Sequence, residues 1–175
     1  MANHTALINI LCEDRPGLIA DVTGRLYELG INLGDTSFAV LGSGAKFTVV
    51  ARLPADVAIK DVDEDLRSMP VLKGAEMSIA PFAYRETHDQ TAHVTHRIEI
   101  AGDDSPGLIA RLSEALRPLA ANIVELNSES APGASGARFI LHMAIWVPKG
   151  KEAVCMATIA NTAGQMNLSC RWQQV

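Results

Sequence analysis

The octapeptide EDRPGLIA at residues 13–20 occurs a second time, as DDSPGLIA, at residues 103–110. The two copies align without gaps over the longer stretches 5–34 and 95–124, at a constant shift of ninety residues. Self-similarity at a fixed period is the sequence signature of a repeated structural unit. We therefore expect this chain of 175 residues to contain two copies of one module.

The similarity continues beyond the gapless stretch, with one insertion. Ala45-Lys46-Phe47 matches Ala137-Arg138-Phe139 if two extra residues are placed in the preceding turn of the second copy. A few residues added to a surface turn cost little free energy. Between the copies, residues 82–93 are polar and show neither strand alternation nor an apolar helical stripe. The predicted domains are residues 1–81 and 94–175, joined by a linker at 82–93.

Each copy begins with a strand followed by an amphipathic helix. The alternation and the Ile and Leu content of residues 6–12 and 95–101 are typical of strands. Apolar residues then recur at helical spacing over residues 18–29 and 108–119, with identical intervals in the two copies. This spacing predicts that each helix buries one face.

Proline and glycine mark the ends of these two helices. Pro16 and Pro106 suit the first helical position, where the missing N–H costs no hydrogen bond. Gly30 is placed to cap the C-terminus of the first helix. Pro118 has no counterpart in the first copy, so we expect the second copy's helix to end or kink near Arg117.

The rest of each copy predicts a hairpin, a second helix and a final strand. The expected strands and helix are 33–41, 46–53, 57–67 and 75–81 in the first copy, and 123–130, 138–147, 149–162 and 166–172 in the second. The order βαββαβ, found twice, predicts an α+β protein of two ferredoxin-like modules, each a four-stranded antiparallel sheet with two helices on one face. The open face of such a sheet favours association, so we expect a homo-oligomer.

The repeated turn is the strongest candidate for a functional site. Gly17 and Gly107 stand at the second position of the expected helices, where glycine costs about 1 kcal/mol relative to alanine. One explanation is that a bound group approaches the backbone closely, with a carboxylate held by the N–H groups of the first helical turn. The other is that glycine lets the turn pack against a neighbouring strand. Both explanations stay open, and they can hold in different copies.

Asn32 and Asn122 occupy equivalent places, after the first helix of each copy and at the start of the next strand. Asparagine at such a point can cap a helix or enter a tight turn. Its amide, which both donates and accepts, can alternatively hold the ammonium or carboxylate of a small zwitterion. The glycine turn in the same copy adds weight to the second interpretation.

A strand, the motif Asp-x-Pro-Gly-Leu-Ile-Ala, an amphipathic helix and an asparagine that opens the next strand together resemble an ACT domain, in both halves of the chain. The tandem arrangement, with AVLG at 39–42 and LKGAE at 72–76, is similar to the glycine cleavage system transcriptional repressor family. This resemblance implies a regulatory protein that binds an amino acid where two modules meet. We expect glycine or serine as the ligand, and a transcription activator or a metabolic enzyme as the protein partner.

The resemblance also implies which residues bind the ligand. The positions that match the motif are Asp14, Arg15, Gly17, Leu18 and Asn32 in the first copy, and Asp104, Ser105, Gly107, Leu108 and Asn122 in the second. Because Arg15 is replaced by Ser105, the two sites are not expected to be equivalent. One half is then the sensor and the other builds the interface.

Composition argues against several other classes of protein. The formal net charge is −5, and the 15 Lys and Arg residues are scattered, so direct nucleic-acid binding is not expected. No apolar run is long enough to span a bilayer, and the N-terminus lacks a secretory signal pattern, which favours a soluble cytoplasmic protein. Cys12, Cys155 and Cys170 lie far apart without metal-ligand spacing and are interpreted as small buried apolar residues.

Enzymatic alternatives fit the sequence less well. It contains no GxSxG elbow, P-loop or GxGxxG motif. His88, His93 and His96 could gather a metal ion, but we interpret them as solvated loop residues and expect no metal, no cofactor and no catalytic residue. The best enzymatic alternative is a small ferredoxin-like hydrolase similar to an acylphosphatase, in which Arg15 and Asn32 would converge on a phosphate.

Overall fold

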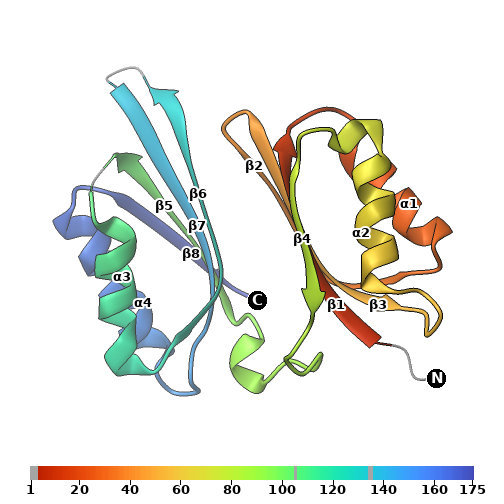
Figure 1. Ribbon diagram of the computed structural model, residues 1–175. Helices are drawn as coiled ribbons and strands as arrows, with labels where there is room; N and C mark the ends of the chain where they lie inside the picture. The colour runs from red at the N-terminus through yellow and green to blue at the C-terminus, as the bar shows by residue number, and fades with distance from the viewer. Residues whose placement is uncertain (1–3, 105, 134–135) are drawn as a thin grey trace. The chain divides into compact units, whose positions relative to one another are not determined.

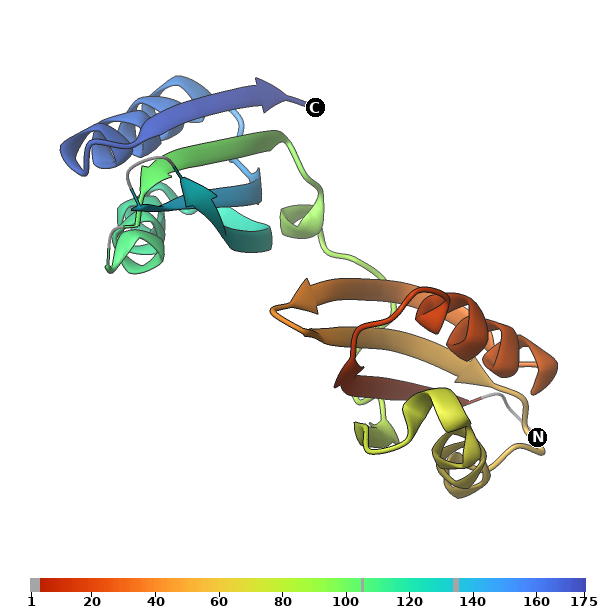
Figure 2. The same ribbon diagram turned by 90° about the horizontal axis from the view of Figure 1, so that it is seen from above.

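The computed structural model describes residues 4–104, 106–133 and 136–175, and the chain divides into two compact units, Met1–Tyr84 and Arg85–Val175. Each unit is a sheet with two helices on one face (Figures 1 and 2), which confirms the predicted α+β class. The division falls within residues 82–93. The Phe82 N–H donates to the Thr5 carbonyl oxygen (2.9 Å) in the first unit, and the Asn122 side-chain amide donates to the Thr91 carbonyl oxygen (2.9 Å) in the second.

The first module has the predicted order βαββαβ. Its elements are β1 (His4–Glu13), α1 (Leu18–Glu28), β2 (Asn32–Leu41), β3 (Gly44–Leu53), α2 (Ile59–Ser68), the short 3₁₀ helix η1 (Pro70–Leu72) and β4 (Glu76–Pro81). The strands lie in the order β2-β3-β1-β4, and every neighbouring pair is antiparallel. Strand β2 is therefore an edge of the sheet and β1 is central.

The second module repeats this arrangement. After the 3₁₀ turn η2 (Gln90–Ala92), its elements are β5 (His96–Asp103), α3 (Leu108–Leu116), the 3₁₀ helix η3 (Arg117–Leu119), β6 (Asn122–Gly133), β7 (Gly136–Trp146), α4 (Glu152–Gln165) and β8 (Ser169–Gln174). The strand order is β6-β7-β5-β8, again antiparallel throughout. The expected helix at 149–162 and the expected strand at 166–172 were both placed too early, because α4 runs from Glu152 to Gln165 and β8 begins only at Ser169.

Each module has its own core between helices and sheet, and the two cores use the predicted positions. In the first, every second residue of β1, from Ala6 to Ile10, is buried, and α1 adds Leu18, Val22 and Leu26. In the second, α3 places Leu108, Leu112 and Leu116 over the sheet in the same way. Full burial of one such side chain stabilises the fold by about 1.5–3 kcal/mol, so these leucines anchor the helices that follow the repeated turns.

The C-termini of α1 and α3 differ as predicted. Gly30 has φ +72°, its N–H donates to the Tyr27 carbonyl oxygen (2.9 Å), and the Ile31 N–H donates to that of Leu26 (3.0 Å). This is a Schellman cap, in which glycine adopts the left-handed conformation without steric cost. Because Pro118 cannot continue the helix, α3 ends at Leu116 and tightens into η3.

The expected insertion of two residues in the second hairpin was wrong. Strand β1 pairs Ile10 with Phe47, whereas β5 pairs the equivalent Ile100 with Leu141. Phe47 therefore corresponds to Leu141, and the insertion amounts to four residues. A shift of two keeps every side chain on the same face of its strand, so the apolar pattern alone does not distinguish the two alignments.

These four residues lengthen the second hairpin. The β2–β3 ladder ends at the pair Leu41–Gly44, but the β6–β7 ladder continues through Pro132–Ala137 to Gly133–Gly136. The expected turn at residues 132–136 is therefore shorter than predicted.

In the described part of the chain, no helix is long and apolar enough to cross a membrane.

Candidate functional site

Gly17 is the residue immediately before α1, and its backbone is left-handed, with φ +88° and ψ −12°. The expectation that Pro16 opens the helix was wrong, because α1 begins at Leu18. The explanation that glycine lets the turn pack against a neighbouring strand does not fit the geometry, since a Cβ built on Gly17 would meet no described protein atom within 4 Å. Glycine is required here by its φ angle, which L side chains rarely adopt.

Hydrogen bonds hold this turn in place. The Asp14 N–H donates to the Ser43 carbonyl oxygen of the β2–β3 hairpin (2.9 Å), and the Leu18 N–H donates to the Arg15 carbonyl oxygen (3.3 Å). The Gly17 carbonyl oxygen accepts from the Asp21 N–H (2.9 Å), which starts the helical ladder. The first N–H groups of a helix have no intrahelical acceptor, so those of Ile19 and Ala20 present partial positive charge to a ligand.

The turn and the edge strand β2 enclose an open hollow. Its lining consists of the consecutive residues Asp14, Arg15, Pro16, Gly17, Leu18, Ile19 and Ala20, together with Phe38 and Val40. Phe38 and Val40 lie on the helix-covered face of the sheet, because their partners across the ladder are the buried Phe47 and Ala45. Both are nevertheless exposed, by 43% and 52%. One wall of the hollow is therefore formed by the backbone and charged side chains of the turn, and the other wall by the apolar side chains of Phe38 and Val40.

The predicted site residues of the first turn take different roles. The side chains of Asp14 and Arg15 are exposed, and these residues supply opposite charges at the rim of the hollow. Leu18 is only 3% exposed and belongs to the core, so it positions the turn and offers little surface to a ligand. Burial raises the pKa of the nearby Cys12 thiol and outweighs the positive charge of Arg15.

Sequence reasoning missed Phe38 and Val40. The available signal was their period-two spacing in a strand that begins directly after α1. That pattern predicted the strand at 33–41, but alternation alone does not tell an edge strand from a central one.

Asn32 does not join the turn of its own module. It pairs with Arg52 at the end of the sheet where β1 starts, whereas Asp14 bonds to the hairpin at the opposite end. The helix α1 separates them and, with 11 residues, spans about 16 Å. The acylphosphatase-like alternative was therefore wrong, because Arg15 and Asn32 do not converge.

The second module reproduces the backbone of the turn. Gly107 precedes α3 with φ +84° and ψ +5°, and its carbonyl oxygen accepts from the Arg111 N–H (2.9 Å). Asp104 is exposed and Leu108 is buried, as in the first module. Ser105, the predicted counterpart of Arg15, lies outside the described residues. Asn122 sits at the far end of the module, where its amide is bonded to the Thr91 carbonyl oxygen.

The histidines and cysteines do not form a site in the described part of the chain. No group of three or more His, Cys, Asp or Glu side chains there is arranged to hold a metal ion. The interpretation of His96 as a solvated residue was wrong: it is 2% exposed in β5, with Nδ1 3.0 Å from Thr95 Oγ1 and its ring beside Trp172. Cys155 is buried as predicted, while Cys12 and Cys170 are partly exposed.

Comparison with known proteins agrees with this architecture. The family model for the ACT domain matches residues 6–69. The glycine cleavage system transcriptional repressor of Escherichia coli (strain K12) is 30% identical over 181 residues, which cover 95% of this chain and 91% of the relative. A solved structure of an unknown protein from Galdieria sulphuraria has a TM-score of 0.75 at 21% identity and covers 99% of both chains. A second structure, described as a candidate glycine cleavage system transcriptional repressor, has a TM-score of 0.68 at 13% identity.

The two βαββαβ modules, each with a left-handed glycine before its first helix, define a tandem ACT-domain protein. The structural neighbours, at low identity, add support for the fold alone. The sequence match over nearly the full length of both chains goes further: this chain belongs to the glycine cleavage system transcriptional repressor family. It is an amino-acid-sensing regulatory protein.

Proposed function

We propose that the first module binds a small amino acid, glycine or serine, in the hollow between the turn at residues 14–20 and strand β2. The observation that supports this most directly is the combination of groups around the hollow. Arg15 and the N–H groups at the start of α1 suit a carboxylate, and Asp14 suits an ammonium group. Phe38 and Val40 supply an apolar wall for the remainder of the ligand.

The second module has a different part in this proposal. It keeps Asp104, Gly107 and Leu108 but has Ser105 where the first module has Arg15. A serine hydroxyl provides no charge to pair with a carboxylate, so this turn binds the ligand more weakly or only completes an assembly of modules. Asn32 and Asn122, far from the turn of their own modules, contribute only if another module or another copy of the chain in a homo-oligomer brings them to it.

The proposed role is regulatory and without a chemical step. Within the described lining of the hollow there is no Ser, Cys, His or Lys side chain, and the one carboxylate, that of Asp14, is assigned to the ammonium group of the ligand. The relatives are named as transcriptional repressors of the glycine cleavage system. We infer that this chain acts on the same process as a co-regulator that does not bind DNA, since its net charge is −5 and its basic residues are scattered.

Regulation then passes through a protein partner. An amino acid shifts the protein between two states only if it binds one of them more tightly. In this proposal the partner, a transcription activator, recognises one of these states. The alternative partner is a metabolic enzyme, which the resemblance to ACT domains equally allows. Affinity capture from cells with and without the bound amino acid distinguishes the two by the identity of the protein recovered.

Calorimetric titration of the full chain with glycine and with serine tests the binding step. The informative variants are Arg15→Ala and Gly17→Ala, and the matched control is Gly74→Ala. Gly74 also has a left-handed φ of +80° and open space around its Cβ position, but it lies outside the hollow. We expect the first two variants to lose binding at millimolar ligand while the control keeps it.

The same titration with Gly107→Ala tests which of the two modules binds the ligand. Its backbone strain equals that of Gly17→Ala, since the two φ angles are +84° and +88°. Binding that survives Gly107→Ala but is lost with Gly17→Ala places the sensor in the first module. Loss of binding with Gly107→Ala but not with Gly17→Ala reverses the assignment, and a wild-type protein that binds no amino acid at millimolar concentration contradicts the proposal altogether.

A further inference from the structure

The helix-free face of the second module's sheet carries a hollow that the proposed function does not use. It has a volume of about 490 Å³, within the range of pockets that hold small molecules. All of its lining comes from strands β5, β6, β7 and β8: Arg97, Ile98, Glu99, Glu125, Asn127, His142, Met143, Ala144, Arg171, Trp172 and Gln173. It is thus complete within one module.

The sheet register orders the charged residues of this hollow into two rows. One row runs Asn127, His142, Glu99, Arg171 across β6, β7, β5 and β8. The next row runs Glu125, Ala144, Arg97, Gln173 across the same strands. Side chains that face each other across a ladder lie about 5 Å apart. Two guanidinium groups and two carboxylates are therefore concentrated on one face around a small floor residue, Ala144, which is 3% exposed.

These polar groups are only loosely paired with one another. Among the described residues, one ion pair is found in this group: it joins Arg97 Nη1 and Glu125 Oε2 at 3.5 Å, and both side chains are about half exposed. Within the described residues, the side chains of Glu99, His142 and Arg171 make no hydrogen bond or ion pair. Charged groups held close together without partners are available to a ligand that carries complementary charges.

The first module is an internal control for this face, because its sheet has the same register. There the positions of Arg97, Glu99 and Arg171 are held by Leu7, Asn9 and Ser78, and Thr48 replaces His142. Thr48 Oγ1 donates to Asn9 Oδ1 (3.0 Å), so these two polar side chains of the row are hydrogen-bonded to each other.

The floor of the hollow also differs between the modules. Val50 stands in the first sheet where Ala144 stands in the second, and its side chain is larger by two methyl groups. The fold therefore requires neither the charges nor the small floor residue.

We propose that this hollow binds a small zwitterion, a free amino acid. Its carboxylate is held by Arg97 and Arg171, and its ammonium group by Glu99 and Glu125. A ligand with a carboxylate alone leaves Glu99 and Glu125 without a partner, and one with an amine alone leaves the two arginines without one, which selects for molecules that carry both charges. A second copy of the chain docked face to face would place one concave surface against another and leave the volume unfilled. This site is separate from the turn of the first module, and neither depends on the other.

Nuclear magnetic resonance of the ¹⁵N-labelled full chain tests the site. Each of the standard free amino acids is titrated to millimolar concentration, and its N-acetylated and carboxamide forms serve as single-charge controls. We expect at least one amino acid to shift the backbone amides of residues 97–99, 142–144 and 171–173, with both blocked forms roughly tenfold weaker or inactive. Shifts confined to residues 15–20 and 38–40 would support the first-module site and overturn this one.

Variants separate binding from folding. Ala144→Val introduces the residue found at this position in the first module, and it is expected to weaken the shifts because its larger side chain projects from the floor of the hollow between the charged groups. Arg171→Gln lies on an exposed edge strand and is expected to weaken binding roughly tenfold without unfolding the module. The matched control, Val50→Ala in the first sheet, is expected to leave the affinity unchanged.

Two results overturn the proposal. Affinity that is unchanged in both Ala144→Val and Arg171→Gln shows that the ligand binds elsewhere. Shifts of the same amides that follow protein concentration without any amino acid identify the face as a surface for self-association.

Discussion

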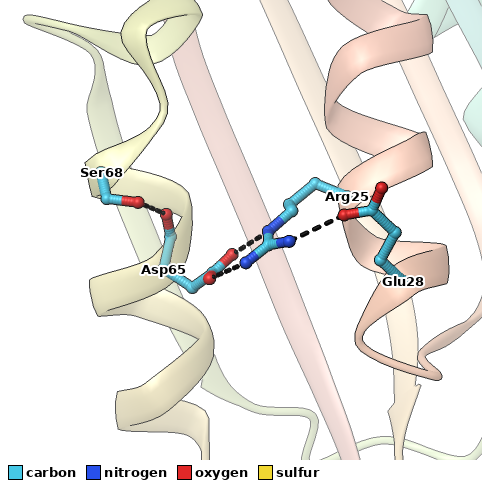
Figure 3. A network of polar contacts seen from close by, with 4 residues as sticks. All are labelled: Arg25, Glu28, Asp65 and Ser68. Atoms are coloured by element: carbon cyan, nitrogen blue, oxygen red, sulfur yellow. Dashed lines mark hydrogen bonds and ion pairs between the residues drawn. The ribbon is translucent and has the colours of Figure 1, made fainter.

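Arg25 of α1 and Asp65 of α2 form a bidentate ion pair that joins the two helices of the first module (Figure 3). Arg25 Nε donates to Asp65 Oδ2 at 2.6 Å, and Nη2 donates to Oδ1. Arg25 Nη1 also donates to Glu28 Oε2 (2.7 Å), which holds the guanidinium in place. The second module has Ala115 at the position of Arg25, so this link between helices belongs to the first module alone.

A double-mutant cycle should show a measurable coupling between these two residues. We expect Arg25→Ala and Asp65→Ala to be coupled in unfolding free energy more strongly than a fully exposed pair, because the ion pair is bidentate and Asp65 is partly screened from water. Urea denaturation of the four proteins measures this coupling. The control cycle uses Lys60 and Glu64, whose side chains are 82% and 65% exposed and 3.3 Å apart. Equal coupling in the two cycles would contradict the assigned role.

The same pair predicts a pH dependence of stability. The hydrogen bonds from Arg25 lower the pKa of Asp65 below its usual value of 3.8. The stabilisation is therefore fully present above that value and is lost as the pH falls through the lower pKa of the folded state. The difference in unfolding free energy between the wild type and Asp65→Asn should be constant near neutral pH and shrink below pH 3.8. A difference that grows on acidification would show that the sign is wrong.

Gly30 and Ala120 occupy equivalent left-handed positions after the first helix of each module, with φ of +72° and +57°. Alanine is strained in this conformation and glycine is not. We expect Gly30→Ala to destabilise the protein by about 1 kcal/mol, and Ala120→Gly to be neutral or to stabilise it by up to about 1 kcal/mol. Thermal denaturation of the two variants gives the comparison. A loss of stability in Ala120→Gly as large as that in Gly30→Ala would show that backbone strain does not decide these positions.

The three thiols should differ in reactivity. Burial raises the pKa of Cys12, Cys155 and Cys170, so each is mostly protonated at neutral pH and reacts slowly. Cys155 is also inaccessible, with 0% exposure, while Cys12 and Cys170 are partly exposed. Alkylation of the native protein, followed by peptide mass spectrometry, should label Cys12 and Cys170 first and Cys155 only after unfolding. Early labelling of Cys155 would indicate that α4 opens locally.

Much of the fold could be predicted because the duplication doubles each local signal. The apolar spacing from Leu18 to Leu26 recurs from Leu108 to Leu116, and both helices form where it indicates. Pro118 also ends α3 as expected, since the effect of a proline on a helix is local.

Register errors show the limit of such local signals. Phe47 and Leu141 are equivalent only because their strands pair that way with β1 and β5, and a shift of two preserves the apolar face.

The candidate sites were harder to predict than the fold. The glycine turn was found from its repetition, but its left-handed φ and the position of Asn32 at the other end of the module are properties of the folded backbone. Phe38 and Val40 reach the turn because β2 returns alongside it, and the charges around Ala144 come together from four strands.

The sequence by itself determined that this protein is a duplicated α+β module with a repeated proline-glycine turn near the start of the first helix of each copy. Those features depend on spacing and on the chemistry of single residues, which are local along the chain. Only the tertiary structure decided which side chains lie beside the turn of the first module, which of two registers the second hairpin adopts, and on which sheet face opposite charges lie together. These depend on strand pairing between distant segments, where many alignments bury the same apolar residues and packing selects one.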